Sequence, residues 1–400
     1  MKNALKMRIG LFTPNYPGVT GEGGIGTYTR NLAHALCELG HELHVLTSAA
    51  CPQQVADGPV AVHVIRRGYV RILDRLLPES GNCYRVRREM RRIVRQHRLD
   101  IVEFPNWEGF GVLFCLRRTV PVVVRLVTSS QESQEIDGTQ TSRLVRWDVR
   151  RERWLVRLAD RIVTHSEAHR RRMAGELRID PGHIHVVHLG VPVHPSFSRP
   201  ARQESGLTVV HLGRMEKRKG VTDLLCAIPQ VLSEVPETRF LFIGSDRPHC
   251  PGGRTHAQFI REEFPAAVQE KISLLGKLPD EEVDRILQQA DLLVSPSLYE
   301  SFGLVLPEAM RWGLPVIGST AGAIPEIVED RRTGLLVPPA SPGELAQAII
   351  ALLVDPERRC ALGEQGRRHV ERHFSIERMA LNVEILYTET LRTWHKRTRS

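Results

Sequence analysis

Short apolar runs alternate with amphipathic stretches along the first half of the chain. Ile25–Leu39 follows a helical pattern, and Gly40 marks its end. Apolar runs of strand length separated by helical stretches indicate βαβ units and a parallel sheet. The strands predicted in this half are Met7–Thr13, Glu42–Thr47, Val60–Arg66, Ile101–Phe104, Val120–Leu126, Arg161–Thr164 and Ile184–His188.

The same alternation restarts after Gly190–Gly206, a proline-containing segment without periodicity. The predicted strands are Leu207–Leu212, Arg239–Ile243, Ile272–Leu275, Asp291–Ser295 and Pro315–Gly318. The predicted helices are Thr222–Glu234, Glu281–Gln289 and Pro342–Leu353. We therefore expect an α/β protein with two doubly wound, Rossmann-like domains. The expected limits are 1–195 for the first domain, 196–206 for a linker, 207–380 for the second domain, and 381–400 for a C-terminal helix that packs back on the first.

Composition agrees with two soluble domains. The chain has 400 residues, of which 42% are hydrophobic and 25% charged. Its seven cysteines are widely spaced and form no CxxC pair, so neither a disulfide framework nor a structural zinc site is expected from them. No stretch resembles a signal peptide or a membrane span. We expect a cytoplasmic protein.

The positive charge is confined to the first half. The first 200 residues carry a net charge of +11 and the last 200 carry −2. This imbalance indicates an anionic partner: a membrane surface, a phosphorylated acceptor or nucleic acid. Two arginine-rich stretches, Arg85–Arg98 and Arg143–Arg161, are amphipathic helices in pattern. One alternative is that these helices pack on their domain and expose a basic face to solvent. The other is that they dock on anionic lipid, which would place the protein on the inner face of the membrane as a peripheral protein. Nucleic acid is not expected as a partner, because no known binding motif occurs.

A glycine-rich loop, Gly21–Gly26, lies between the first predicted strand and the first helix. Glycines there let the backbone approach a phosphate, and a helix N-terminus favours negative charge. The spacing differs from GxGxxG, and a tight turn explains the loop equally well.

A second loop, Gly213–Gly220, follows the first strand of the second half and carries Arg214 and Lys219. Arginine offers a fork to phosphate oxygens and lysine a compact charge. An exposed basic loop is the alternative. The position at the carboxyl end of a strand, where open α/β sheets bind ligands, favours function.

The third segment is Glu300–Glu308, after the predicted strand Asp291–Ser295. Pro307 lacks an N–H, so it fits only the first turn of a helix. The helix should begin near Gly303 and leave free N–H groups at about 303–305, where a diphosphate would be favoured. The two carboxylates would then accept hydrogen bonds from sugar or ribose hydroxyls. The alternative is two surface glutamates near a helix start.

Together these motifs resemble the GT4 family of GT-B glycosyltransferases, over almost the whole chain. The most specific are GRMEKRKG at 213–220, ESFGLVLPE at 300–308 and GAIPEIVEDRRTGLLVPP at 322–339. The first half adds GGIGTYTRNLAHALCELGHELHVLT at 23–47 and ADRIVTHSEAHRR at 159–171. The resemblance implies a GT-B fold, in which an acceptor-side first domain and a nucleotide-sugar-binding second domain face a central cleft.

The resemblance also implies roles for individual residues. Arg214 and Lys219 would neutralise the donor diphosphate, Glu308 would bind the ribose, and Glu300 would lie by the transferred sugar. The backbone of Ser301, Phe302, Gly303, Leu304 and Val305 would run along the sugar and phosphates, and Gly23 and Gly24 would close on the diphosphate. The family's reaction retains anomeric configuration, usually needs no metal and uses no further cofactor. The sequence does not decide between front-face transfer and double displacement.

One position departs from the family pattern. Members often have a histidine where VVVRLVTSS places Val127, so a role for a histidine there is in doubt. His165 and His169 are four apart, but the order HSEAH differs from HExxH, and we expect Ser166 to cap a helix rather than the pair to bind metal.

The function implied is a retaining, metal-independent hexosyl-type glycosyltransferase using a UDP- or GDP-sugar. The acceptor would be a hydroxyl compound, lipid-linked or anionic, in cell-surface polysaccharide or glycolipid synthesis. The alternatives are a glycosyl phosphorylase, a non-hydrolysing nucleotide-sugar epimerase, and a catalytically inactive GT-B scaffold.

Overall fold

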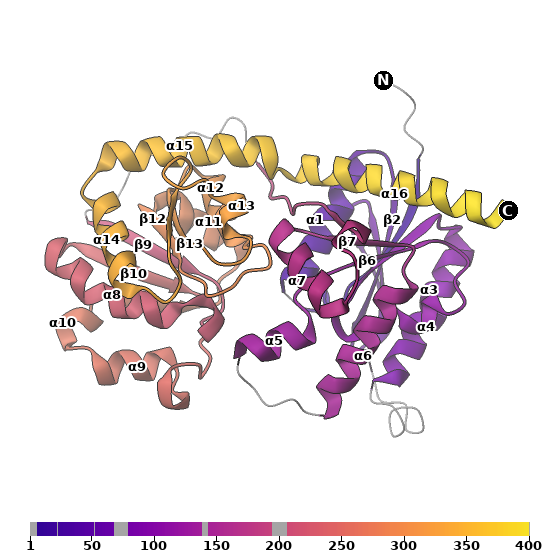
Figure 1. Cartoon of the computed structure of the whole chain (residues 1–400), viewed down its shortest axis with the longest axis horizontal. Helices are drawn as coiled ribbons and strands as arrows, with labels where there is room; N and C mark the ends of the chain where they lie inside the picture. Colours follow the sequence, from indigo (N-terminus) through magenta and orange to yellow (C-terminus); the bar gives the residue numbers. More distant parts are fainter. Residues whose placement is uncertain are drawn as a thin grey trace. The chain divides into compact units, whose positions relative to one another are not determined.

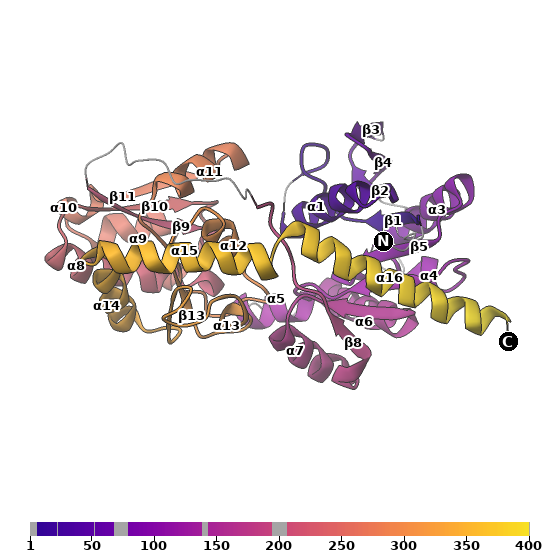
Figure 2. The same cartoon turned by 90° about the horizontal axis from the view of Figure 1, so that it is seen from above.

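The chain folds into two compact units. The structure, a computed structural model, describes residues 6–21, 23–51, 53–67, 79–137, 143–193 and 206–399. The first unit comprises Met1–Leu189 and Ile376–Ser400, and the second comprises Gly190–Ser375. Both units are shown in Figures 1 and 2. The linker expected at 196–206 lies outside the described residues, apart from Gly206.

The first unit is built on one sheet, in which the described strands follow the order β3-β4-β2-β1-β5-β6-β7-β8. Neighbouring strands are parallel, except that β3 runs antiparallel to β4. The strands are β1 (Arg8–Phe12), β2 (Glu42–Ala49), β3 (Gln53–Asp57), β4 (Val60–Arg66), β5 (Ile101–Pro105), β6 (Val122–Arg125), β7 (Arg161–Thr164) and β8 (Ile184–Val186). The helices are α1 (Gly24–Glu38), α3 (Ser80–His97), η1 (Trp107–Gly109), α4 (Val112–Cys115), α5 (Ser130–Asp137), α6 (Arg143–Leu158), α7 (Glu167–Leu177), η2 (Pro181–His183) and α16 (Ile376–Arg399).

The second unit has a wholly parallel sheet, whose described strands follow the order β11-β10-β9-β12-β13-β14. The strands are β9 (Leu207–Leu212), β10 (Thr238–Ile243), β11 (Ile272–Gly276), β12 (Leu292–Ser295), β13 (Val316–Ser319) and β14 (Leu335–Val337). The helices are η3 (Lys217–Lys219), α8 (Val221–Glu234), η4 (Pro251–Gly253), α9 (His256–Glu263), α10 (Ala266–Gln269), α11 (Asp280–Gln289), α12 (Val305–Met310), α13 (Ile324–Ile327), α14 (Pro342–Leu353) and α15 (Pro356–His373).

The predicted fold class is confirmed, because both units are doubly wound α/β domains. Each predicted strand is present within about two residues of its expected ends. The pattern missed β3 and β14. The first is a polar edge strand (QQVAD) and the second has three residues, so neither carries the apolar run that identifies a buried strand.

The strand order places a switch point in each sheet. In the first unit the chain reverses direction across the sheet between β1 and β5, and in the second between β9 and β12. Open α/β sheets bind ligands at the carboxyl ends of the strands that flank such a point. The glycine-rich loop follows β1, the loop with Arg214 and Lys219 follows β9, and the segment with Glu300 follows β12. All three predicted motifs therefore stand at switch points.

Helix α16 belongs to the first unit, although it ends the chain. It packs beside α1 (Figure 1), and the hydroxyl of Tyr387 donates to Glu103 Oε2 at 2.8 Å. His41 Nε2 lies 3.2 Å from Glu384 Oε1, which adds a second polar contact. Within the described residues, no helix is both long and apolar enough to cross a membrane.

Tyr387→Phe should lower the free energy of unfolding of the first unit by about 1–3 kcal/mol, because the buried Glu103 carboxylate loses a hydrogen-bond donor. Urea unfolding followed by circular dichroism measures the change. Ile385→Ala is the matched control on the same helix; this side chain is 57% exposed, and we expect a change within about 0.5 kcal/mol. Equal destabilisation by the two substitutions would contradict the anchoring role of Tyr387.

Candidate functional site

Hydrogen bonds join the loop after β9 to the segment after β12. The N–H of Leu298 donates to the carbonyl of Arg218 at 2.8 Å. In return, Nη1 of Arg218 donates to the carbonyl of Tyr299 at 3.3 Å. Because β9 and β12 are adjacent parallel strands, their carboxyl ends meet at one edge of the sheet, and these bonds join the two predicted motifs there.

Glu300 is the centre of this junction. Its side chain is only 6% exposed, and Oε2 lies 3.1 Å from Arg218 Nη1. Oε1 forms an ion pair with the ammonium of Lys219 and accepts a hydrogen bond from Ser297 Oγ at 3.0 Å. One buried carboxylate thus holds two cations from the neighbouring loop.

The ion pairs decide the charge state of Glu300. Burial alone would raise its pKa, but the charges of Lys219 and Arg218 outweigh that effect and hold the pKa at about 2. Burial lowers the pKa of Lys219, and the charge of Glu300 opposes the change. The carboxylate is therefore ionised at neutral pH, and it favours the charged form of the lysine.

Two glycines allow the backbone to approach this closely. Gly220 has a φ of 64°, and a Cβ there would lie 2.0 Å from the carbonyl oxygen of Pro296. Gly322 has a φ of 58°, and its Cβ would lie 2.2 Å from the carbonyl oxygen of Glu300. The same carbonyl accepts a hydrogen bond from the N–H of Ala323 at 2.9 Å. The start of segment 322–339, at Gly322 and Ala323, therefore packs against the backbone of Glu300 and holds it in position.

Arg214 and Glu308 lie near this junction but outside its ion pairs. Arg214 is exposed and pairs with Glu216 at 2.7 Å. Its charge contributes to the lowered pKa of Lys219. Glu308 is half-buried on α12; burial raises its pKa, while Arg311 and Lys219 oppose the change. The carboxylate of Glu308 takes part in no ion pair with the described residues, so it is available to a ligand.

The helix after Glu300 starts slightly later than predicted. It was expected near Gly303, but α12 begins at Val305, with Pro307 in its first turn as expected. The delay has a physical reason: Gly303 adopts a φ of 99°, which ends the preceding turn rather than starting a helix. Among the described residues, no acceptor is found for the N–H groups of Gly303, Leu304 and Val305. These are the amides that the sequence assigned to a diphosphate.

Arg218 is the residue of the candidate site that sequence reasoning missed in this unit. The prediction paired Arg214 with Lys219, whereas the structure pairs Arg218 with Lys219 around Glu300. The signal was present, because three cations follow one another at 217–219. In the short helix η3, consecutive residues point in different directions, and sequence alone does not show which of them faces Glu300.

In the first unit, the glycine-rich loop forms the N-terminus of α1. Gly24 is the first residue of the helix and Gly23 its N-cap, and a Cβ on Gly24 would meet no atom within 4 Å. A Cβ on Gly26 would lie 2.6 Å from the carbonyl oxygen of Asn15, so this glycine lets the loop fold onto the end of β1. The loop is compatible with the predicted phosphate contact, which stays a prediction.

A buried ion pair stands in the neighbouring strands of the first unit, and sequence reasoning missed it too. Glu103 in β5 and Arg125 in β6 lie 2.8 Å apart with side chains 5% and 2% exposed. Tyr28 donates to Glu103 Oε1 at 3.1 Å, and Nη1 of Arg125 has no hydrogen-bond partner among the described residues. Val127 lines a small cavity beside this pair. The sequence signal for this pair was a charged residue in each of two apolar strands, IVEFP and VVVR, because a buried charge needs a partner.

The histidine motif of the first unit is structural. Ser166 caps α7, as predicted, by accepting from the N–H of His169 at 3.0 Å. Nδ1 of His169 is hydrogen-bonded to Thr164 Oγ1 at 2.6 Å, and Nε2 lies 3.1 Å from Glu132 Oε2. Its two nitrogens are thus occupied by protein groups.

Comparison with known proteins identifies the class. The model described as "Glycosyltransferase Family 4" matches residues 22–194, and the model "Glycosyl transferases group 1" matches residues 195–369. The fold and these matches define a GT-B glycosyltransferase. The chain belongs to the GT4 family.

Individual relatives cover nearly the whole chain. The D-inositol 3-phosphate glycosyltransferase of Corynebacterium kroppenstedtii is 25% identical over 94% of this chain and 87% of its own length. The N-acetyl-alpha-D-glucosaminyl L-malate synthase of Bacillus anthracis is 25% identical over 97% of this chain and 98% of its own. The solved structure of Anabaena Alr3699/HepE in complex with UDP-glucose has a TM-score of 0.70 at 18% identity, covering 97% of this chain and 100% of that chain.

Gly322→Ala should destabilise the second unit by about 2 kcal/mol or more, because alanine combines an unfavourable positive φ with a clash against the Glu300 carbonyl. Thermal and urea unfolding measure the effect. Gly343→Ala is the control: this glycine lies in the first turn of α14, where an added Cβ meets nothing within 4 Å, and we expect unchanged or slightly higher stability. A tolerated alanine at position 322 would contradict the support assigned to Gly322.

Proposed function

We propose that this GT4 enzyme is a retaining hexosyltransferase that uses a UDP- or GDP-linked sugar and transfers the sugar to a hydroxyl acceptor. The observation that carries the proposal is the buried cluster of Glu300, Lys219 and Arg218 at the switch point of the second sheet. The relative of known structure binds UDP-glucose. A cytoplasmic role in cell-surface polysaccharide or glycolipid synthesis is part of the same proposal.

The proposed chemistry is stabilisation of the leaving diphosphate. Negative charge builds on that group as the glycosidic bond breaks. Positive charge that is already in place comes from Lys219, Arg214 and the free amides at 303–305. Such preorganised groups stabilise the transition state more than the ground state. This is the charge that a metal ion would otherwise provide, so the reaction is proposed to be metal-independent.

The carboxylates divide two tasks. Glu308 is available to accept hydrogen bonds from the ribose hydroxyls of the donor. Glu300 is occupied by two cations, so we assign it to holding Lys219 in place beside the transferred sugar. Because Glu300 is engaged in this way, we propose front-face transfer, in which a phosphate oxygen of the donor takes the acceptor proton, rather than attack by a carboxylate.

The acceptor is proposed to be anionic. The first 200 residues carry a net charge of +11. The names of two relatives contain a phosphorylated cyclitol, inositol 3-phosphate, and a dicarboxylate, malate. Val127 replaces the histidine that family members often have, and it lies beside Arg125, whose Nη1 is unpaired among the described residues. A cation near the reaction centre suits an anionic acceptor better than an imidazole does.

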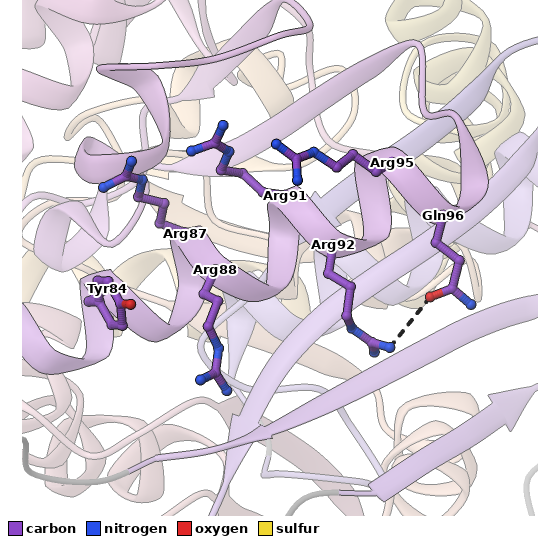
Figure 3. A pocket seen from close by; sticks show the side chains of 7 residues that line it. All are labelled: Tyr84, Arg87, Arg88, Arg91, Arg92, Arg95 and Gln96. Atoms are coloured by element: carbon purple, nitrogen blue, oxygen red, sulfur yellow. Dashed lines mark hydrogen bonds between the residues drawn. The ribbon is translucent and has the colours of Figure 1, made fainter.

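Contact with an anionic membrane is the second part of the partner proposal. Five arginines of α3 line one surface pocket and project from the helix (Figure 3). The lining residues are Tyr84, Arg87, Arg88, Arg91, Arg92, Arg95 and Gln96. Glu89 is the one acidic residue within α3. An apolar groove of about 480 Å³ lies between α3, α4 and α6. Two of its side chains, Trp154 and Leu116, are 50% and 61% exposed. Arginines beside exposed apolar groups are typical of a membrane-binding surface.

The donor site is tested by substitution. Glu308→Ala should weaken binding of the nucleotide-diphosphate sugar at least about tenfold, since charged hydrogen bonds of this kind contribute about 1.5–3 kcal/mol. Arg214→Ala should lower kcat/KM by about 10²-fold or more. Calorimetry and a nucleotide-release assay measure the two effects, and the exposed Glu357→Ala is the control. Wild-type behaviour of both variants would exclude this donor site.

The donor is identified first, by thermal shift with a panel of UDP- and GDP-sugars. Epimerised free nucleotide sugar without acceptor would support the epimerase alternative. Donor binding without turnover over many acceptors would support the inactive scaffold.

Replacing Arg87, Arg91 and Arg95 by glutamine should lower partition onto vesicles that contain anionic phospholipid at least about tenfold, because each arginine near such a surface contributes about 1 kcal/mol. Co-sedimentation with neutral and anionic vesicles measures the effect. The control replaces Arg261, Arg358 and Arg372, three exposed arginines of the second unit. Equal binding of the wild-type protein to both vesicle types would overturn the membrane proposal.

A further inference from the structure

Three histidines meet between helix α3 and strands β2 and β4 of the first sheet. His44 is the third residue of β2, His63 lies in β4, and His97 ends α3. The parallel register pairs His44 with Ala61 and Leu46 with His63, so His44 and His63 point to the same face. Helix α3 packs against β2 and β4 and brings His97 to them.

The imidazole nitrogens are close enough to share a ligand. His44 Nδ1 lies 3.1 Å from His63 Nε2. One ligand atom from each of the three histidines lies within 4.8 Å of the others. In a tetrahedral zinc site with Zn–N bonds of about 2.0–2.1 Å, the nitrogens are about 3.3 Å apart. The separation of the first pair is close to this value, and the ligand atom of His97 lies within 4.8 Å of the other two.

Two of the three imidazoles of the cluster are buried. His44 and His63 are 5% and 6% exposed. Nδ1 of His63 is buried and has no hydrogen-bond partner among the described residues.

A carboxylate orients one of the rings. Glu42 Oε1 lies 3.0 Å from His44 Nε2. If the carboxylate accepts the Nε2 proton, the lone pair of Nδ1 points into the cluster. Metal-ligating histidines usually donate their other ring N–H to a carboxylate, a backbone carbonyl or water. Arg92 is the nearby cation, and Glu89 lies 2.5 Å from its Nη2 and balances its charge.

We propose that His44, His63 and His97 bind a divalent metal ion of the zinc type, with water in the fourth position. Three imidazoles suit Zn²⁺, Cu²⁺ or Ni²⁺ rather than Mg²⁺ or Ca²⁺. The site is structural. His44 is in register with Gly10 in the middle of β1, whereas the predicted ligand contact of this sheet follows the carboxyl end of β1. The bound ion ties α3 to β2 and β4. The proposal stands independently of the glycosyl transfer proposed above.

Titration of the full-length, chelator-treated protein with ZnCl₂ by calorimetry tests the site. We expect one Zn²⁺ per chain at micromolar or tighter affinity, no comparable binding of MgCl₂, and a higher Tm in the presence of Zn²⁺. Co²⁺ should give the absorption spectrum of a tetrahedral site. Absence of binding, or binding only at millimolar Zn²⁺, would overturn the proposal.

Variants locate the ion. His97→Gln should lower the affinity by more than about 100-fold, because a ligand is lost, and Glu42→Gln by about 10–100-fold, because only its partner is lost. Glu42 is 45% exposed, so this second variant is expected to fold even if the first does not. His395→Gln, an exposed histidine of α16, is the matched control. Unchanged Zn²⁺ binding in both His97→Gln and Glu42→Gln would place the ion elsewhere and contradict the site.

Discussion

The proposed donor site of the second unit depends on one buried carboxylate with two cations. Isolated burial of Glu300 would cost several kcal/mol, and the cations offset that cost only while both loops keep their positions. Lys219 and Arg218 come from the loop after β9, and Glu300 comes from the segment after β12. Three kinds of contact therefore depend on one another. They are the ion pairs of Glu300, the hydrogen bonds between Arg218 and residues 298–299, and the close backbone approach at Gly220 and Gly322.

In the proposed site, this arrangement keeps a buried cation charged for a ligand. Glu300 opposes the effect of burial on the pKa of Lys219, so the ammonium charge is favoured. A diphosphate that enters beside Lys219 meets a positive charge whose position has already been fixed, and little reorganisation is needed when its own charge increases. Arg214 is exposed and paired with Glu216, so it is free to change partner when a ligand arrives.

Much of the fold and the outline of the site follow from the sequence. Apolar runs such as Leu207–Leu212 identify buried parallel strands, and the glycines, cations and Pro307 that follow them mark the ligand edge. The parts that escaped prediction depend on tertiary geometry. Arg218 and Lys219 are neighbours in sequence, and only the packed loop shows that both reach Glu300. The polar strand β3 has no apolar pattern, and it exists because β4 offers an edge.

The first unit shows the same limitation. The Glu103–Arg125 pair and the His44–His63–His97 cluster each join residues from separate elements, and no local spacing reveals them. Their positions suggest different roles. The ion pair lies in the central strands β5 and β6, next to Val127, where an acceptor is proposed. The histidines lie between α3 and the strands β2 and β4, where a metal ion is proposed to tie these elements together.

A double-mutant cycle between Lys219 and Glu300 tests the central claim most directly. Binding of the nucleotide-diphosphate donor is measured by calorimetry for the wild-type protein, Lys219→Gln, Glu300→Gln and the double variant. If Glu300 acts by holding Lys219, each single substitution weakens binding, and the double substitution costs little more than Lys219→Gln, with a coupling energy of about 1 kcal/mol or more. Losses that simply add would show that the two residues act on the donor independently and would contradict the account.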